Sequence, residues 1–141
     1  MRALHGNRTA RRMPKADIEA LAEFRYCLRR FLRFSEELTR AHGMTPLQYQ
    51  LLLQIKGFPG RSWATVGELA ERLQAKHHGV VALISRCEAV EWVARRASPT
   101  DRRRVEVTLT SKGEARLDRL ARLHRRELAS VRDSLNPPVV A

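Results

Sequence analysis

Cationic side chains gather in one short stretch of this chain, between two runs of apolar residues. The stretch contains five arginines and only two acids, Asp101 and Glu106. The five are Arg95, Arg96, Arg102, Arg103 and Arg104. A guanidinium group stays charged at neutral pH, binds phosphate oxygens, and enters the narrow, electronegative minor groove of duplex DNA. The stretch therefore predicts contacts with the backbone and minor groove of a nucleic acid.

A second set of candidate residues lies just before the arginines, at helical spacing. Val80, Leu83, Ile84 and Cys87 follow an i, i+3, i+4, i+7 pattern, which predicts the buried face of a helix. The candidates for contacts with bases are His77, His78, Val81, Ala82, Ser85 and Arg86. Short polar groups can hydrogen-bond base edges, and Arg86 can bind either guanine or a phosphate. A solvated helix face is the alternative interpretation.

These candidates are expected on a helix-turn-helix followed by a β-hairpin. Thr65 and Glu68 have the spacing of a capping box and open a short helix, which a turn at 74–76 joins to the helix of the second set. Beyond them, residues 92–109 predict a hairpin, because apolar residues alternate in its second half and Ser98 to Asp101 have turn composition. Thr45 and Pro46 open a further helix that ends at Lys56, and 57–64 reads as a loop in which Trp63 packs.

Two long amphipathic helices are predicted at the ends of the chain, at about 17–42 and from a cap at Ser111 to about 135. The first is roughly 40 Å long at 1.5 Å per residue, which exceeds what a domain of this size needs for its own core. We therefore expect part of both helices to pack on a second copy of the chain. The residues expected at this dimer contact are Leu21, Phe24, Leu28, Leu120, Leu128, Val131 and Leu135.

Composition limits the possible classes of protein. The 141 residues suit one domain, and 27 Lys and Arg against 15 Asp and Glu give a net charge of +12, which favours a polyanionic partner. No apolar run is long enough for a membrane span and no secretory signal is visible, so we expect a cytoplasmic protein without a membrane partner. Residues 1–16 predict a flexible basic arm, either a disordered tail or a DNA contact.

Other kinds of site find little support in the sequence. The two cysteines, Cys27 and Cys87, are too far apart and too few for a disulfide framework or a zinc site. Adjacent helical residues such as His77 and His78 point about 100° apart and cannot share one metal ion. No nucleophile–base–orienter set is visible, so we expect no enzyme, no cofactor and no metal.

The chain resembles the multiple antibiotic resistance regulator (MarR) family over about residues 17–135. The resemblance rests on the GELAERL run at 67–73 and on Asp101-Arg102-Arg103 followed by Val107-Thr108-Leu109-Thr110 and Gly113. It implies a mostly α-helical winged helix-turn-helix with a small β-hairpin wing, in which 45–110 is the DNA-binding lobe and 17–44 and 111–136 are dimerisation helices. Where the family often ends its recognition helix with Gly-Leu-Val, this chain has Glu91-Trp92-Val93.

The resemblance also implies a function. It predicts a homodimeric regulator, a repressor of transcription, that binds a pseudo-palindromic duplex and responds to a small aromatic or other organic effector. It further implies that one of Arg102 and Arg103, with Arg102 favoured, enters the minor groove while the other pairs with Asp101. Cys27 lies where the hydroperoxide-sensing branch keeps a reactive cysteine, although a packed, inert thiol is the alternative. A basic helical module that binds protein or RNA is the alternative function.

Overall fold

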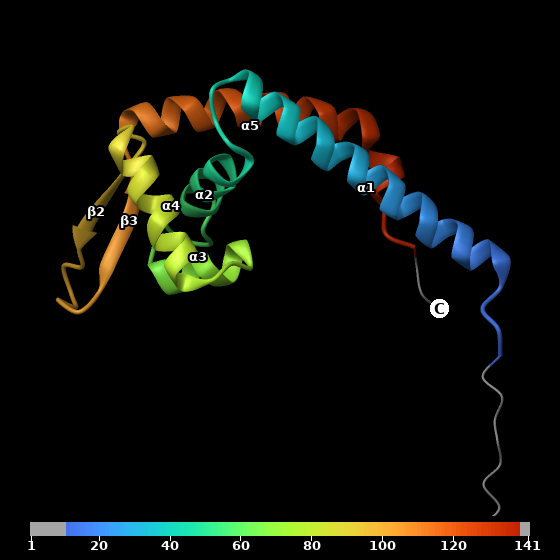
Figure 1. The fold of residues 1–141 in the computed structure, drawn as a ribbon, viewed down its shortest axis with the longest axis horizontal. Helices are drawn as coiled ribbons and strands as arrows, with labels where there is room; N and C mark the ends of the chain where they lie inside the picture. Colours follow the sequence, from blue (N-terminus) through green and yellow to red (C-terminus); the bar gives the residue numbers. More distant parts are fainter. Residues whose placement is uncertain (1–10, 139–141) are drawn as a thin grey trace, which may run out of the picture.

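The computed structural model describes residues 11–138, within which the fold is mostly helical with one small sheet (Figure 1). Residues 1–10, which hold most of the expected basic arm, lie outside the described residues. The elements are α1 (Lys15–Ala41), α2 (Pro46–Lys56), β1 (Trp63–Ala64), α3 (Val66–Leu73), α4 (His77–Ala89), β2 (Val93–Ala97), β3 (Val105–Leu109), α5 (Ser111–Val131) and the 3₁₀ helix η1 (Arg132–Leu135). No helix of the described part is long and apolar enough to cross a membrane.

The molecule has two parts that meet along α5 (Figure 1). The long helices α1 and α5 lie against each other, and α1 also contacts η1. A lobe formed by α2, α3, α4 and the sheet packs against the first half of α5, whereas α1 extends away from this lobe. The predicted arrangement, a winged helix-turn-helix between two long terminal helices, is confirmed.

The core of the lobe is built around α2. Leu51, Leu52 and Ile55 of this helix are fully buried, and Leu69 of α3 and Ile84 of α4 pack with them. Removing each such side chain from water stabilises the fold by about 1.5–3 kcal/mol. The apolar spacing of the sequence therefore sets how α3 and α4 lie, because each helix must turn its stripe toward α2.

The sheet contains one strand more than the hairpin predicted from the sequence. Strands β2 and β3 pair antiparallel, from Val93 opposite Leu109 to Ala97 opposite Val105. On the other edge of β3, β1 pairs Trp63 with Thr108 and Ala64 with Val107. The expectation that all of 57–64 is a loop was therefore wrong at its end, because a two-residue strand is too short to show any periodicity.

The start of α5 is joined to the end of α4 by a close backbone contact. The cap is Thr110 rather than the predicted Ser111: its Oγ1 accepts the Gly113 N–H at 3.0 Å and donates to the Glu91 carbonyl at 2.5 Å. The Thr110 N–H also donates to the Trp92 carbonyl at 3.0 Å. A Cβ on Gly113 would lie 1.9 Å from that same carbonyl oxygen, so only glycine fits there.

The exit of α4 uses a left-handed residue without being glycine. Glu91 has φ of 63°, and the Trp92 N–H reaches back to the Cys87 carbonyl at 2.9 Å. This is the bond pattern with which a helix commonly ends at a glycine. The chain thus ends α4 with a residue that carries a side chain in a left-handed, strained conformation.

Candidate nucleic-acid interface

The buried stripe of α4 fixes which of its side chains face solvent. Val80, Leu83, Ile84 and Cys87 are buried, as the sequence predicts, and burial raises the pKa of the Cys87 thiol to about 11. A thiol with so high a pKa stays protonated and inert. The predicted contact residues of this helix are all exposed; they are His77, His78, Val81, Ala82, Ser85 and Arg86.

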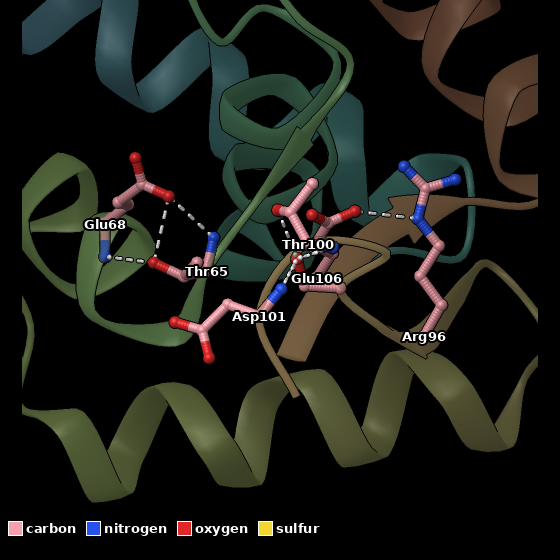
Figure 2. Close-up of polar contacts among 7 residues, drawn as sticks. Thr65, Glu68, Arg96, Thr100, Asp101 and Glu106 are labelled. Atoms are coloured by element: carbon pink, nitrogen blue, oxygen red, sulfur yellow. Dashed lines mark hydrogen bonds and ion pairs between the residues drawn. The ribbon is translucent and has the colours of Figure 1, made fainter. Parts of the chain in front are cut away.

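Helix α3 is held by the capping box that the sequence predicts, which Figure 2 shows. Thr65 Oγ1 accepts the Glu68 N–H at 3.3 Å, and Glu68 Oε1 accepts the Thr65 N–H at 3.0 Å. Although desolvation by burial raises the pKa of Glu68, hydrogen bonds from Thr65 and the ion pair with Arg61 outweigh it and lower this pKa. The carboxylate therefore stays charged and connects α3 to the loop before β1.

Residues 93–109 form the wing, and residues 98–104 between its two strands are the tip. Polar contacts of the wing's own side chains order this tip. Ser98 is buried, and its Oγ accepts the N–H groups of Thr100 and Asp101 at 3.3 and 3.2 Å. Arg96 forms an ion pair with Glu106 across the strands at 3.0 Å, where the Glu106 side chain is only 5% exposed (Figure 2). These contacts fold the turn without using the arginines at its tip.

The structure differs from the expected pairing of Asp101 with a tip arginine. Asp101 Oδ1 accepts the backbone N–H of Arg103 at 2.9 Å, and no described residue forms an ion pair with it. A short acidic side chain in a turn bonds readily to a backbone amide two residues ahead. The side chains of Arg102 and Arg103 are therefore both exposed, and no acid of the described part pairs with either.

The five arginines of the stretch thus divide into two groups. Arg96 is paired within the sheet, and the guanidinium of Arg95 contacts Glu88 of α4 at 3.0 Å. Arg102, Arg103 and Arg104 carry charges that no described acid neutralises. A positively charged wing tip beside an exposed helix face is the arrangement that the sequence predicts, but fewer of its charges are free than composition suggests.

Arginines and aromatic rings stack on the side of the wing where β1 pairs with β3. No motif of the sequence indicates this stack. The Arg61 guanidinium lies 4.1 Å from the Phe58 ring centroid and 3.8 Å from that of Trp63, and Arg104 lies 6.0 Å from Trp63. Cation–π contacts of this kind are attractive by about 0.5–2 kcal/mol. The alternation of Phe58, Arg61 and Trp63 in the loop is the only sequence signal for it, since the partner Arg104 is far along the chain.

The structure also places the remaining chemical candidates. Among residues 11–138 no cluster of three or more His, Cys, Asp and Glu could hold a metal ion, so His77 and His78 have no third ligand there. Cys27 is half-buried, and its sulfur lies 3.5 Å from a carboxylate oxygen of Glu23. The structure thus places an acid beside this sulfur, and no described ion pair or hydrogen bond brings an arginine to it.

The residues predicted for the dimer contact do not all lie on one surface. Leu21 and Leu128 are 43% and 40% exposed, and Phe24, Leu28, Val131 and Leu135 are partly exposed along α1, α5 and η1. Leu120 is only 1% exposed and belongs to the chain's own core. Its assignment to the dimer contact was therefore wrong, because the early part of the α5 stripe packs on α2 rather than outward.

A buried histidine, which no motif of the sequence indicates, joins the two parts of the molecule. The His124 ring stacks on Tyr49 of α2 at 4.4 Å and 8°, and its nitrogens contact Ser35 Oγ and the Leu120 carbonyl, each at 2.7 Å. Phe31 and Phe34 of α1 meet the ring edge-on. His124 continues the apolar stripe of α5, and counting only aliphatic positions overlooked it.

A groove lies beside this junction, between the end of α2 and the first half of α5. Its volume is about 560 Å³, and its lining includes Leu53, Ala115 and Ala121. The ion pair of Lys56 with Glu114, at 2.8 Å, stands at its margin. A volume of this size suits a small organic molecule.

Comparisons with known proteins agree with this geometry. Residues 42–104 match the sequence model described as MarR family. The chain is 31% identical over 90 residues, 64% of its length, to a protein of Thauera aromatica whose name describes a transcriptional regulatory protein for the hcr operon. It spans about half the length, 52%, of that curated relative.

Solved structures show the same fold. A MarR family protein from Bacillus stearothermophilus superposes with a TM-score of 0.73 at 24% identity, covering 89% of this chain and 86% of that one. A mutant MarR from E. coli complexed with operator DNA gives 0.64 at 23% identity, covering 81% and 79%. At this level of identity the likeness shows the winged-helix fold.

Proposed function

We propose that this chain, which is similar to the MarR family model over residues 42–104, is a transcription regulator of that kind. It binds duplex DNA as a homodimer and represses the genes at its operator. The observation that carries the proposal is the pair of exposed, unpaired side chains of Arg102 and Arg103 beside the exposed face of α4. Cations that a fold leaves unneutralised are available to bind phosphates. A regulator of this kind acts in the cytoplasm, where its DNA lies.

The two exposed surfaces suit the two grooves of duplex DNA. Helix α4 has the size to enter the major groove, where Ser85 and Arg86 can contact base edges and Val81 can touch a thymine methyl group. A wing arginine fits the minor groove, whose negative potential is strongest where the groove is narrow. Few of the exposed α4 side chains can read bases, so we expect DNA shape to contribute much of the specificity.

The homodimer is supported by the exposed apolar residues of the long helices. Leu21 and Leu128 are large, exposed apolar side chains on α1 and α5, and a second copy would remove them from water. A two-fold dimer places its two recognition helices about one turn of DNA apart, roughly 34 Å, which requires a pseudo-palindromic operator. Mass measurement in solution at micromolar concentration is expected to give a dimer, and a stable folded monomer would contradict this part.

Modulation by a small effector is supported by the groove between α2 and α5. A ligand there contacts both the lobe and the helix that carries the dimer surface, so it can favour one spacing of the recognition helices over another. An aromatic or other small organic acid is the effector class that the family suggests. Lys56 is the cation among the lining residues, and it is paired with Glu114 at 2.8 Å.

Selection from a random-sequence pool tests the proposed function. Duplexes enriched by the chain are expected to contain an inverted repeat and to bind more tightly than a random duplex of equal length at each of two salt concentrations. Phosphate contacts alone carry no sequence information, so equal affinity for every duplex would refute specific regulation. That outcome would favour a basic module that binds protein or RNA.

A further inference from the structure

Arg95 belongs to the wing by sequence, but its side chain turns away from the tip and onto α4. Its Nη1 donates to Glu88 Oε1 at 3.0 Å, and its Nη2 donates to Ser85 Oγ at 3.0 Å. The same Nη2 lies 3.4 Å from the carbonyl oxygen of Val81. The backbone N–H of Arg95 adds a bond to Glu88 Oε2 at 3.4 Å. One side chain of β2 therefore contacts α4 over two helical turns.

This contact needs the shape of a guanidinium group as well as its charge. The planar fork directs separate N–H groups at several acceptors, whereas a lysine ammonium is a compact point charge on a flexible stem. The side chains of Arg95 and Glu88 are 30% and 42% exposed, so the ion pair is partly shielded from solvent. A DNA phosphate that approached Arg95 would have to compete with a carboxylate already in place.

We infer that Arg95 is a positioning residue for DNA recognition rather than a phosphate contact. By joining β2 to Ser85 and Glu88, it fixes the outer part of the wing relative to α4, beyond the buried Val93 and Val107. We call the contact of Arg95 with Ser85 and Glu88 the joint. The joint sets the separation between the minor-groove and the major-groove contacts. This separation decides which DNA shape fits both contacts. The inference rests on the proposed function, because it assigns Arg95 a role in reading the operator.

Arg96 provides a matched control on the same strand. It too forms an ion pair, but its partner Glu106 lies directly opposite on β3, within the wing. Breaking this pair removes a contact of similar chemistry without releasing the wing from α4. If substitution of Arg95 changes the duplex preference and substitution of Arg96 does not, the cause is the contact with α4 rather than the charge of the wing.

The variant Glu88→Ala separates a positioning role of Arg95 from a phosphate contact, because the two roles predict different changes in the preference for one duplex over another. The probes are a duplex enriched by the wild-type chain and a random duplex of equal length. If Arg95 positions the wing, preference for the enriched duplex falls about two- to fivefold, as expected for a partly exposed ion pair. If Arg95 binds phosphate, loss of the acid removes a repulsive charge and frees the arginine, so affinity for both duplexes rises equally. An unchanged preference for the enriched duplex would overturn the inference.

The variant Arg95→Lys gives a second test that keeps the charge. A positioning role predicts the same loss of preference as in Glu88→Ala, with the slope of log affinity against log salt unchanged, while Arg96→Lys keeps the preference. If Arg95→Lys keeps the preference for the enriched duplex, the inference is overturned. It is also overturned if the salt slope of Arg95→Ala falls by about 1, because that is the change expected when one phosphate contact is lost. A wild-type chain without any preference overturns the proposed function itself, which distinguishes the two failures.

Discussion

The proposed recognition helix α4 and the wing are neighbours on the surface, but different interactions hold them. Helix α4 is positioned by a buried apolar stripe that includes Val80 and Ile84, both at most 1% exposed. The base of the wing is held by the buried Val93 and Val107, whereas its outer part is held by ion pairs, Arg95 with Glu88 and Arg96 with Glu106. Buried apolar contacts contribute more to stability than exposed ion pairs do. Substitutions in the helix stripe should therefore change folding, whereas substitutions in the wing should change recognition.

The largest expected effect tests the helix side of this contrast. Ile84→Ala removes a fully buried side chain from the core, which costs about 2–5 kcal/mol of unfolding free energy. Denaturant unfolding followed by circular dichroism measures this cost. Val81→Ala on the exposed face of the same helix is the control and should change stability by less than about 0.5 kcal/mol. Equal losses in the two variants would contradict the orientation of α4.

The next effect falls on the wing tip. Replacing Arg102 and Arg103 together by alanine should weaken DNA binding by about 1–3 kcal/mol and lower the salt slope, because unpaired cations are lost from the surface. The unfolding free energy should stay nearly unchanged. Fluorescence titration at several salt concentrations measures the first effect and thermal melting the second. A large fall in melting temperature would mean that the tip arginines hold the wing together.

The capping box of α3 gives a smaller effect that depends on pH. The folded-state pKa of Glu68 is lower than its ordinary value of 4.5, so the charged carboxylate stabilises the fold above that pH, and this contribution is lost as pH falls through the folded-state value. Glu68→Gln should lower the melting temperature at neutral pH and leave it unchanged in acid. Glu71→Gln, on the exposed side of the same helix, is the control. A difference that persists at low pH would argue against the charge as its cause.

The smallest expected effect concerns the join between the two regions. Glu91 has φ of 63° where α4 ends, a conformation that costs a residue with a side chain about 1 kcal/mol relative to glycine. Glu91→Gly should therefore raise the unfolding free energy by up to about 1 kcal/mol, measured by denaturant unfolding. DNA binding should change little, because the backbone path stays the same. Destabilisation by this change would show that the Glu91 side chain has a stabilising role.

The contrast between helix and wing also explains how far the sequence could predict the structure. Periodic burial leaves a pattern, so the stripe of α4 and the capping boxes at Thr45 and Thr65 were predicted correctly. Contacts between residues far apart in the chain leave none, so the strand β1 and the His124 junction were not found. The cap of α5 was misplaced by one residue, because Thr110 and Ser111 are equally suitable by type and only the backbone path decides between them.

The candidate site shows the same limit. Composition correctly marked the wing as cationic, yet it could not tell which arginines are neutralised within the molecule. Arg95 is close in sequence to Arg96 but contacts a different element, and Asp101 bonds to a backbone amide instead of a guanidinium. Charge can be counted along a chain, whereas the partner of each charge depends on the fold.

The contact between Gly113 and the Trp92 carbonyl has a mechanical consequence. With no room for even a methyl group, and with the Thr110 N–H bonded to the same oxygen, the start of α5 cannot pivot against the exit of α4. A rotation of the start of α5 would therefore carry the exit of α4, the proposed recognition helix, with it. The next contact between the lobe and the long helices lies farther along α5, where His124 packs among the rings of α1 and α2.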